Sequence, residues 1–169
     1  MGLLLVVRDM KMRSRLSIAS AEISVFSYST EDEEKVRRAV LNILPQGLGE
    51  SLRFSSSSLR GHYNDRILIL MAEVKEGTIG LAHHLLRHLS QGDQRRLLDE
   101  VERRMDGSGN LYIRLNKQEA LLGRLELGDA DPIWVKLKFR SRGRRVSARS
   151  VKEALSALLG ESGGIGEQS

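Results

Sequence analysis

Residues 133–140 read IWVKLKFR, the clearest strand pattern in the chain, because apolar side chains alternate with mostly basic ones. Such a strand keeps one face on the core and turns the other toward solvent. The inner side chains are those of Ile133, Val135, Leu137 and Phe139. The outer side chains are those of Trp134, Lys136, Lys138 and Arg140. The stretch therefore predicts a half-buried strand whose outer face is basic and carries a tryptophan.

A second strand with the same alternation is predicted at residues 111–116, where Tyr112 and Arg114 point outward. If both strands share one sheet and one core side, their outer faces coincide. Aromatic rings stack on bases and cations hold phosphates, so this face is a candidate platform for single-stranded RNA. The alternative is an ordinary half-exposed sheet in which Trp134 packs under a helix or in a subunit contact, such as that of a homodimer.

The remaining elements interleave strands and helices without strict alternation. The apolar run at residues 67–72 predicts a central strand covered on both faces. Thr30 is the expected N-cap of the first helix, with Glu33 completing a capping box. Strands are predicted at 16–28, 51–59 (an edge strand or a loop), 66–75 and 124–127. Helices are predicted at 30–44, 78–89, 93–105, 117–123 (a short helix or a turn) and 147–159. This order favours an α+β fold with a mostly antiparallel or mixed sheet and helices packed on it.

Length and composition fit one domain. We expect a short extension at residues 1–13, one α+β domain at 14–159 and a disordered Gly/Ser/Glu tail at 160–169. The chain of 169 residues has no cysteine, which excludes disulfides, zinc–thiolate sites and a thiol nucleophile. The apolar run at residues 3–7 is too short to span a membrane. These features favour a cytoplasmic protein.

The positive charge is concentrated in one segment. Residues 136–152 contain eight basic residues and no acidic one, whereas the remaining 19 basic residues are outnumbered by 22 acidic ones. Such a patch is the electrostatic footprint of a polyanion binder. Its centre is the glycine-containing loop at residues 142–145, the basic loop, which leads into a helix N-terminus. The candidate phosphate contacts in and after the loop are Arg142, Arg144, Arg145 and Arg149. A merely solvated loop is the alternative.

No pattern in the chain requires catalysis. His84 and His88 have a spacing that can hold a metal, but no further ligand joins them, so a packing or surface role is expected. The acidic run at residues 31–34 stands at a predicted helix start, which indicates capping. Phosphate-loop, dinucleotide, serine-nucleophile and zinc-protease motifs are missing. We expect a non-catalytic protein without a metal or cofactor, and a metal-dependent nuclease built on these residues remains the distant alternative.

Several segments carry a resemblance to a known family. They are STEDEEKV at residues 29–36, GHY at 61–63, residues 68–72 and, above all, GNLYIRLNKQEA at 109–120. Across about residues 14–159 the chain resembles an archaeal family of RNA-binding proteins that are predicted exosome subunits. The resemblance implies a fold similar to that of the large-subunit ribosomal protein that binds 5S rRNA. It also implies RNA binding, a link to RNA processing and no catalysis.

The resemblance adds candidate positions. Carried over residue by residue, they are His62, Tyr63, Tyr112, Arg114, Lys117 and Gln118. A structural turn at 61–63 and a polar helix start at 117–118 remain open as alternatives. The chain departs from the family where Asn64-Asp65-Arg66 replaces Gly-Asn-Pro, and where Asn116 replaces an aspartate. A second functional hypothesis is an adaptor that docks on an RNA-processing complex, such as the exosome, or on a ribosomal complex through its basic patch.

Overall fold

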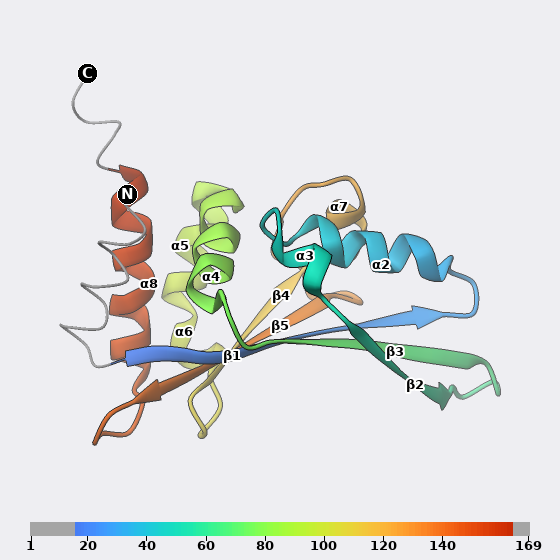
Figure 1. Ribbon diagram of the computed structural model, residues 1–169, viewed down its shortest axis with the longest axis horizontal. Helices are drawn as coiled ribbons and strands as arrows, with labels where there is room; N and C mark the ends of the chain where they lie inside the picture. Colours follow the sequence, from blue (N-terminus) through green and yellow to red (C-terminus); the bar gives the residue numbers. More distant parts are fainter. Residues whose placement is uncertain (1–15, 164–169) are drawn as a thin grey trace.

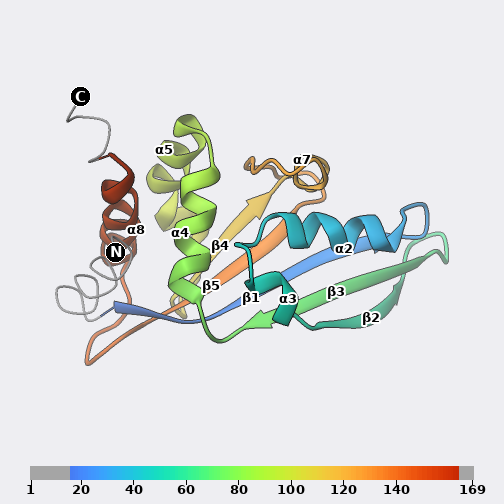
Figure 2. The same ribbon diagram turned by 45° about the horizontal axis from the view of Figure 1, so that its top comes forward.

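The computed structural model describes residues 16–163, and these residues form an antiparallel sheet with helices on one side (Figures 1 and 2). The strand order is β2-β3-β1-β5-β4. The strands are β1 (Leu16–Tyr28), β2 (Phe54–Arg60), β3 (Arg66–Val74), β4 (Asn110–Leu115) and β5 (Ile133–Ser141). The helices are α2 (Glu33–Asn42), α3 (Leu48–Ser51), α4 (Thr78–His88), α5 (Gln91–Asp99), α6 (Val101–Arg104), α7 (Lys117–Leu121) and α8 (Ala148–Gly163). The predicted fold class, α+β with an antiparallel sheet, is confirmed.

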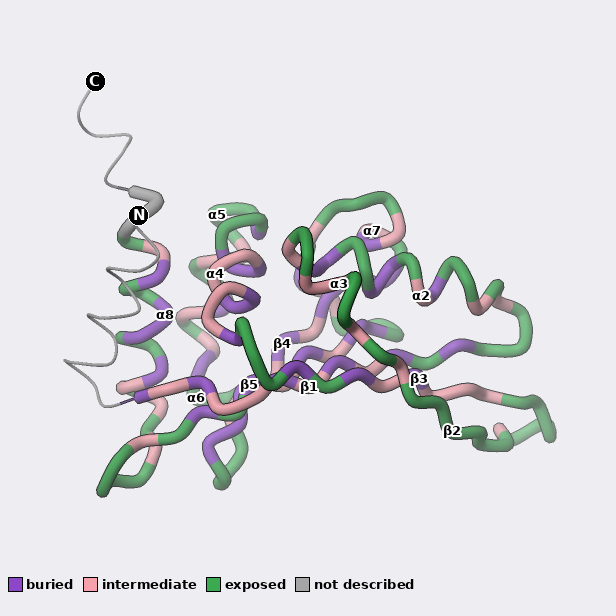
Figure 3. Tube along the Cα trace, in the orientation of Figure 1, coloured by how far each residue is buried: buried purple, intermediate pink, exposed green. Residues whose placement is uncertain are grey.

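The core lies between the sheet and the helices, and β1 is its central strand (Figure 3). Ile23 of β1 lies opposite Ala72 of β3 on one side and Val135 of β5 on the other, and all three are buried. The inner face of β5 is buried as its alternation predicts. Each fully buried aliphatic side chain of this kind contributes about 1.5–3 kcal/mol. A register shift between Ile18 and Ser20 marks a bulge in β1.

The start of α2 differs from the prediction. Asp32, not Thr30, is the N-cap, and its carboxylate accepts a hydrogen bond from the backbone N–H of Glu34 at 3.0 Å. Aspartate caps at least as well as threonine, and here Thr30 belongs to the turn that follows β1. Asp32 therefore caps the helix and Glu33 and Glu34 lie in its first turn, as expected, whereas Glu31 pairs with Lys117. The apolar stripe of the helix, which includes Val36 and Val40, is buried.

The prediction that β3 is covered on both faces is wrong. The strand lies next to the edge strand β2, and only its inner face, with Leu70 and Ala72, is buried. Ile67, Ile69 and Met71 point to the other face and remain half-exposed. A continuous apolar run shows that both faces of a strand carry hydrophobic side chains, but it does not show whether other elements pack on both faces.

The helix predicted at 93–105 is two helices. Ser90 begins α5 by accepting the N–H of Asp93 at 3.1 Å, and Glu100 separates α5 from α6. The predicted strand at 124–127 is reduced to one bridge between Leu127 and Leu115, and α8 continues to Gly163, past the predicted end. The predicted extension at residues 1–13 and residues 164–169 of the predicted tail lie outside the described residues.

Candidate nucleic-acid interface

The outward side chains of β4 and β5 meet on the face of the sheet that no helix of the described residues crosses (Figure 1). We call it the open face. Across the two strands, Trp134 pairs with Arg114 and Lys136 pairs with Tyr112. The structure thus brings these four candidate residues together on one surface, as their shared alternation predicts.

Trp134 is oriented by its neighbour on β4. Cζ of Arg114 lies 5.6 Å from the centre of the Trp134 ring, a distance at which cation and ring attract each other. Nη2 of Arg114 also lies 3.2 Å from the Asp129 carboxylate, which fixes the guanidinium. On the other side Trp134 pairs with the small Ser24 of β1. Trp134 is half-exposed and lies on the opposite face of β5 from the buried Ile133 and Val135.

Tyr112 is held by a carboxylate in the turn before β4. Its hydroxyl donates to Oδ2 of Asp106 at 3.1 Å. Asp106 also accepts the side-chain amide of Asn110 at 2.8 Å and the backbone N–H groups of Ser108 and Asn110. These hydrogen bonds, the Asn110 amide first, lower the pKa of Asp106 to about 2. Partial burial and the Asp106 carboxylate raise the pKa of Tyr112, so its ring stands fixed and neutral beside Trp134.

Basic side chains run from β5 into the loop before α8. Lys136 lies opposite Glu22 of β1, and Lys138 is exposed. The other exposed cations are Arg140, Arg142, Arg144 and Arg145 (Figure 3 shows this loop as exposed). No carboxylate in residues 16–163 forms an ion pair with these four arginines or with Lys138. Unpaired, solvated cations of this kind are free to meet phosphates.

The first turn of α8 continues the basic segment. Oγ of Ser147 accepts the N–H of Ser150 at 3.1 Å, as an N-cap does. Arg149 follows with its side chain 91% exposed and only a 3.4 Å contact to Glu153. It is therefore nearly as available to a ligand as the arginines of the basic loop.

Lys117 is placed differently from the other candidates. Its side chain is 4% exposed, and Nζ lies 2.9 Å from the Glu31 carboxylate and also pairs with Asp131. Nζ further donates to the backbone carbonyl of Phe26 and lies 5.3 Å from the Tyr28 ring. The amine thus joins the start of α7 to the end of β1. Two carboxylates therefore pair with this amine, whereas the exposed cations of β5 and the basic loop pair with no carboxylate among the described residues.

The three other positions suggested by resemblance, His62, Tyr63 and Gln118, lie in two separate places. Tyr63 stands at the tip of the β2–β3 hairpin, 84% exposed, with its ring 5.1 Å from that of His62. This hairpin and the basic loop lie at opposite ends of the sheet (Figure 1). Asn64 has φ +65°, a conformation that asparagine tolerates, so the departure from Gly-Asn-Pro still permits the turn. Gln118 is exposed at the start of α7.

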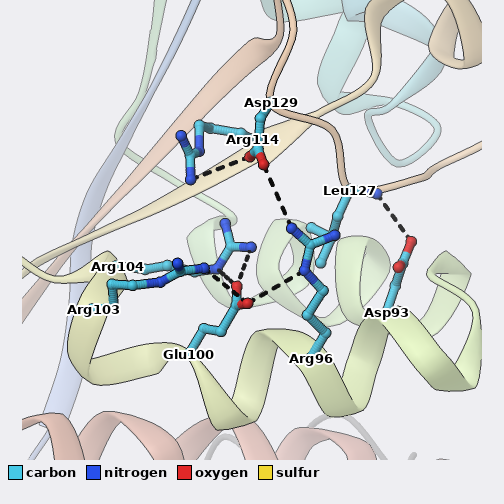
Figure 4. Close-up of polar contacts among 8 residues, drawn as sticks. All are labelled: Asp93, Arg96, Glu100, Arg103, Arg104, Arg114, Leu127 and Asp129. Carbon is cyan, nitrogen blue, oxygen red and sulfur yellow. Dashed lines mark hydrogen bonds and ion pairs between the residues drawn. The ribbon is translucent and has the colours of Figure 1, made fainter.

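An arginine cluster beside β4 was not among the sequence-based candidates (Figure 4). Glu100 binds Arg104 at 2.6 Å, Arg103 at 2.8 Å and Arg96 at 3.3 Å. Partial burial opposes ionisation of Glu100, but hydrogen bonds from Arg104 and Arg103 outweigh it and lower its pKa to about 2. The sequence shows these arginines only as the polar face of a helix. They lie three or four residues from Glu100, so helical spacing places them around one carboxylate.

Asp129 joins this cluster to the open face. Its carboxylate lies 3.5 Å from Nη2 of Arg96 and 3.2 Å from Nη2 of Arg114 (Figure 4). A continuous chain of charges therefore runs from α5 through Asp129 to Arg114, the residue that stacks on Trp134. This chain links the arginine cluster to the part of the open face that carries the aromatic rings.

The histidine pair and the acidic run form no metal site among the described residues. The rings of His84 and His88 are 4.2 Å apart, and Nδ1 of His88 lies 2.9 Å from the carbonyl oxygen of His84. Partial burial and the neighbouring histidines lower the pKa of His84. Within residues 16–163, no helix is both long and apolar enough to cross a bilayer.

Comparison with known proteins places these features in context. The model of a family described as RNA binding matches residues 20–139. The RNA-binding protein PAB1135 of Pyrococcus abyssi is 29% identical over 134 residues, 77% of this chain and 87% of the relative. Protein AF2318 of Archaeoglobus fulgidus superposes with TM-score 0.71 at 29% identity, covering 84% of this chain and 99% of its own. A DUF54 protein of Methanothermobacter thermautotrophicus gives TM-score 0.66 at 27% identity, with coverage of 84% and 98%.

Proposed function

The chain belongs to the family described as RNA binding, and from that premise we propose that it is a non-catalytic protein that binds RNA on its open face. One observation carries the proposal. Half-exposed Trp134 and Tyr112 stand beside a row of cations on β5 that continues into the basic loop. Recognition of unpaired RNA requires aromatic rings that stack on the bases and nearby cations that bind the phosphates.

The cations supply the affinity. Lys138, Arg140 and the three arginines of the basic loop have no carboxylate partner among the described residues. Each phosphate that they neutralise releases a counterion, so binding should weaken steeply with salt. Lys136 contributes less, because Glu22 lies opposite it in the sheet. Arg149 extends the same surface onto the first turn of α8.

The aromatic residues supply the preference for unpaired bases. The Trp134 ring is held by Arg114, and the Tyr112 ring is held by its hydroxyl bond to Asp106. A ring fixed in advance loses little conformational entropy when a base stacks on it. Direct contact through Lys117 is not part of the proposal, because two carboxylates already occupy its amine.

The test is fluorescence anisotropy with single-stranded, duplex and structured RNA, each over a salt series. We expect micromolar or tighter binding to single-stranded RNA near physiological salt. Weak binding to all three forms that disappears with modest salt would refute the function and leave only a generic polyanion surface. Incubation of the same RNAs with magnesium or manganese should leave them intact, and cleavage would contradict the non-catalytic assignment.

The cellular setting extends the proposal. Together with the family resemblance, an RNA-binding surface on a compact domain supports a cytoplasmic role in RNA processing, with the exosome or a ribosome-related complex as partner. The measurement is reconstitution with purified exosome subunits, followed by size-exclusion chromatography. If the protein and the exosome subunits still elute together after nuclease treatment, a direct protein contact is supported. If they elute separately, the exosome is excluded as the partner.

A second candidate function rests on the other half of the open face. There Phe26, Tyr28 and Leu59 are 38%, 36% and 49% exposed, and half-exposed Ile67 and Ile69 lie beside them. An apolar area of this kind suits a protein partner, which favours an adaptor subunit or a homodimer. The variant Leu59→Glu distinguishes the roles. It should weaken protein association or dimerisation in sedimentation equilibrium and leave RNA affinity unchanged.

A further inference from the structure

A small hollow lies where the edge of β4 meets the open face, and no residue of the basic loop belongs to it. Its volume is about 310 Å³. Three arginines, two aromatic rings and one carboxylate line it, namely Arg103, Arg104, Arg114, Tyr112, Trp134 and Asp106. The size is at the lower end of the range for small-molecule pockets, about 300–1,000 Å³. It suits one nucleotide rather than a folded partner.

Arg104, which lines the hollow, has a donor that no described residue uses. Its side chain is 2% exposed, and Nε and Nη2 both donate to the same oxygen of Glu100, at 3.0 and 2.6 Å. Nη1 is buried and has no hydrogen-bond partner among the described residues. Buried donors without a partner are uncommon and costly. A phosphate oxygen that enters the hollow is an acceptor of the right chemistry for this group.

Arg103 gives the hollow an exposed cation. Its side chain is 67% exposed, and its one ion pair is a 2.8 Å contact to Glu100. Because Glu100 also binds Arg96 and Arg104, one carboxylate serves three guanidinium groups and neutralises none of them fully. Arg103 can therefore turn to a phosphate while Glu100 keeps its other two partners.

The carboxylate in the wall does not repel a ligand strongly. The oxygens of Asp106 accept four hydrogen bonds, from Tyr112, from Ser108 and from the amide and backbone of Asn110. Their charge is thus directed into the turn that precedes β4. On the open side of the hollow stand the two rings, with Arg114 stacked on Trp134.

We propose that this hollow binds one unstacked nucleotide of single-stranded RNA, with the base against Trp134 and Tyr112 and the phosphate on Arg103 and Arg104. The inference rests on the proposed function and deepens it, because it assigns the RNA class and adds two arginines from α6. A paired base has no free face to stack on a protein ring, so duplex RNA does not enter the hollow.

The fluorescence of the protein tests the proposal directly. Trp134 is the one tryptophan in the chain, so its emission reports on the wall of the hollow without a label. The titrant is single-stranded oligouridine of about 12 nucleotides, within the usual site sizes for such proteins, and a duplex of the same length serves as comparison. Labelled copies of both RNAs give the total affinity by anisotropy.

The chain offers a matched pair of arginine variants. Arg103→Ala removes the proposed phosphate contact. Arg124→Ala removes an arginine of equal exposure, 67%, with the same 2.8 Å distance to a glutamate, Glu119 of α7. Both variants lose one positive charge and one surface ion pair, so they differ in whether the lost arginine lines the hollow. Circular dichroism melts of both confirm that each variant is folded.

We expect saturable quenching of Trp134 by the single strand and none by the duplex. Arg103→Ala should weaken the single-strand complex about fivefold or more, and Arg124→Ala should leave it within twofold of the parent. The proposed nucleotide site would be refuted if the single strand bound in the anisotropy assay but left Trp134 emission unchanged and bound both variants equally. RNA binding itself would then still stand. Loss of binding to every RNA would instead overturn the proposed function.

Discussion

The basic loop allows a prediction whose magnitude follows from the structure. Arg142, Arg144 and Arg145 are exposed, and none of them pairs with a carboxylate among residues 16–163. Replacing all three by alanine therefore removes three cations without breaking an internal ion pair. We expect the fold to be unchanged and the affinity for RNA to fall with every sequence, because phosphate contacts carry no sequence information.

The salt dependence gives the number. Each phosphate contact contributes about 0.7 to the slope of log affinity against log salt on a single strand. If each arginine neutralises one phosphate, the triple variant loses about two slope units. Between 50 and 200 mM salt, a fourfold change, the parent affinity should then fall about 20-fold more than the affinity of the variant.

The assay is anisotropy with one labelled RNA over that salt range. The control is a triple variant with the same charge change, Arg38→Ala, Arg87→Ala and Arg95→Ala. These arginines are exposed on α2, α4 and α5, which cover the other side of the sheet. The control should keep the parent slope. Parallel salt lines for the parent and the loop variant would refute the assignment of the basic loop, whatever the absolute affinities.

Three further predictions concern stability. Lys117→Met leaves two part-buried carboxylates without their cation and should lower the free energy of unfolding in urea by about 2 kcal/mol, while RNA affinity of the folded protein stays unchanged. The folded state lowers the pKa of Glu100 from 4.5 to about 2, so the ionised carboxylate stabilises the fold above pH 4.5 and this stability is lost as the pH falls toward 2. The variant Glu100→Gln lacks this carboxylate. Its urea midpoint should therefore fall less than that of the parent between pH 4.5 and 2. Gly109 has φ +84°, and an added Cβ would lie 3.0 Å from the carbonyl oxygen of Phe139. Gly123 has a similar φ of +80°, but an added Cβ would meet no atom within 4 Å. Gly109→Ala should therefore lower the melting temperature more than Gly123→Ala.

Local patterns in the sequence were enough to predict most of the fold. The alternation in β4 and β5 is set by burial of one face, so it gives both the strands and the side chains that share the open face. The apolar run of β3 was misread, because hydrophobicity cannot tell a covered face from an exposed one. The N-cap of α2 was misplaced by two residues, since Thr30 and Asp32 both satisfy the capping preference.

The candidate site was harder to predict because its partners are distant in sequence. Lys117 and Arg114 come from one motif and carry the same charge, yet one is buried and the other lies on the open face. Lys117 is buried by Glu31, 86 residues away, and no local pattern reports that contact. The arginines around Glu100 likewise look like an ordinary polar helix face, because no local pattern reports that this face lies beside Tyr112, Arg114 and Trp134.

Asn116 shows how a departure from the family can leave the structure intact. Its side-chain oxygen accepts the N–H of Glu119 at 3.1 Å and so caps α7. Aspartate caps a helix equally well, so the aspartate usual in the family would make the same bond. The loss of the negative charge at position 116 also has little effect on the stabilisation of the Lys117 amine, because Glu31 and Asp131 already pair with it.

The hollow and the basic loop belong to one continuous surface because the turn before β4 packs against the end of β5. The backbone N–H of Phe139 donates to the carbonyl of Gly109 at 3.0 Å, and a Cβ on Gly109 would lie 3.3 Å from Val146, the residue after the basic loop. The turn that holds Asp106, and through it Tyr112, is therefore seated on the strand that carries the cations. An unpaired base in the hollow and its neighbouring phosphates along β5 would thus be bound by one rigid unit. The absence of a side chain at Gly109 permits that close contact.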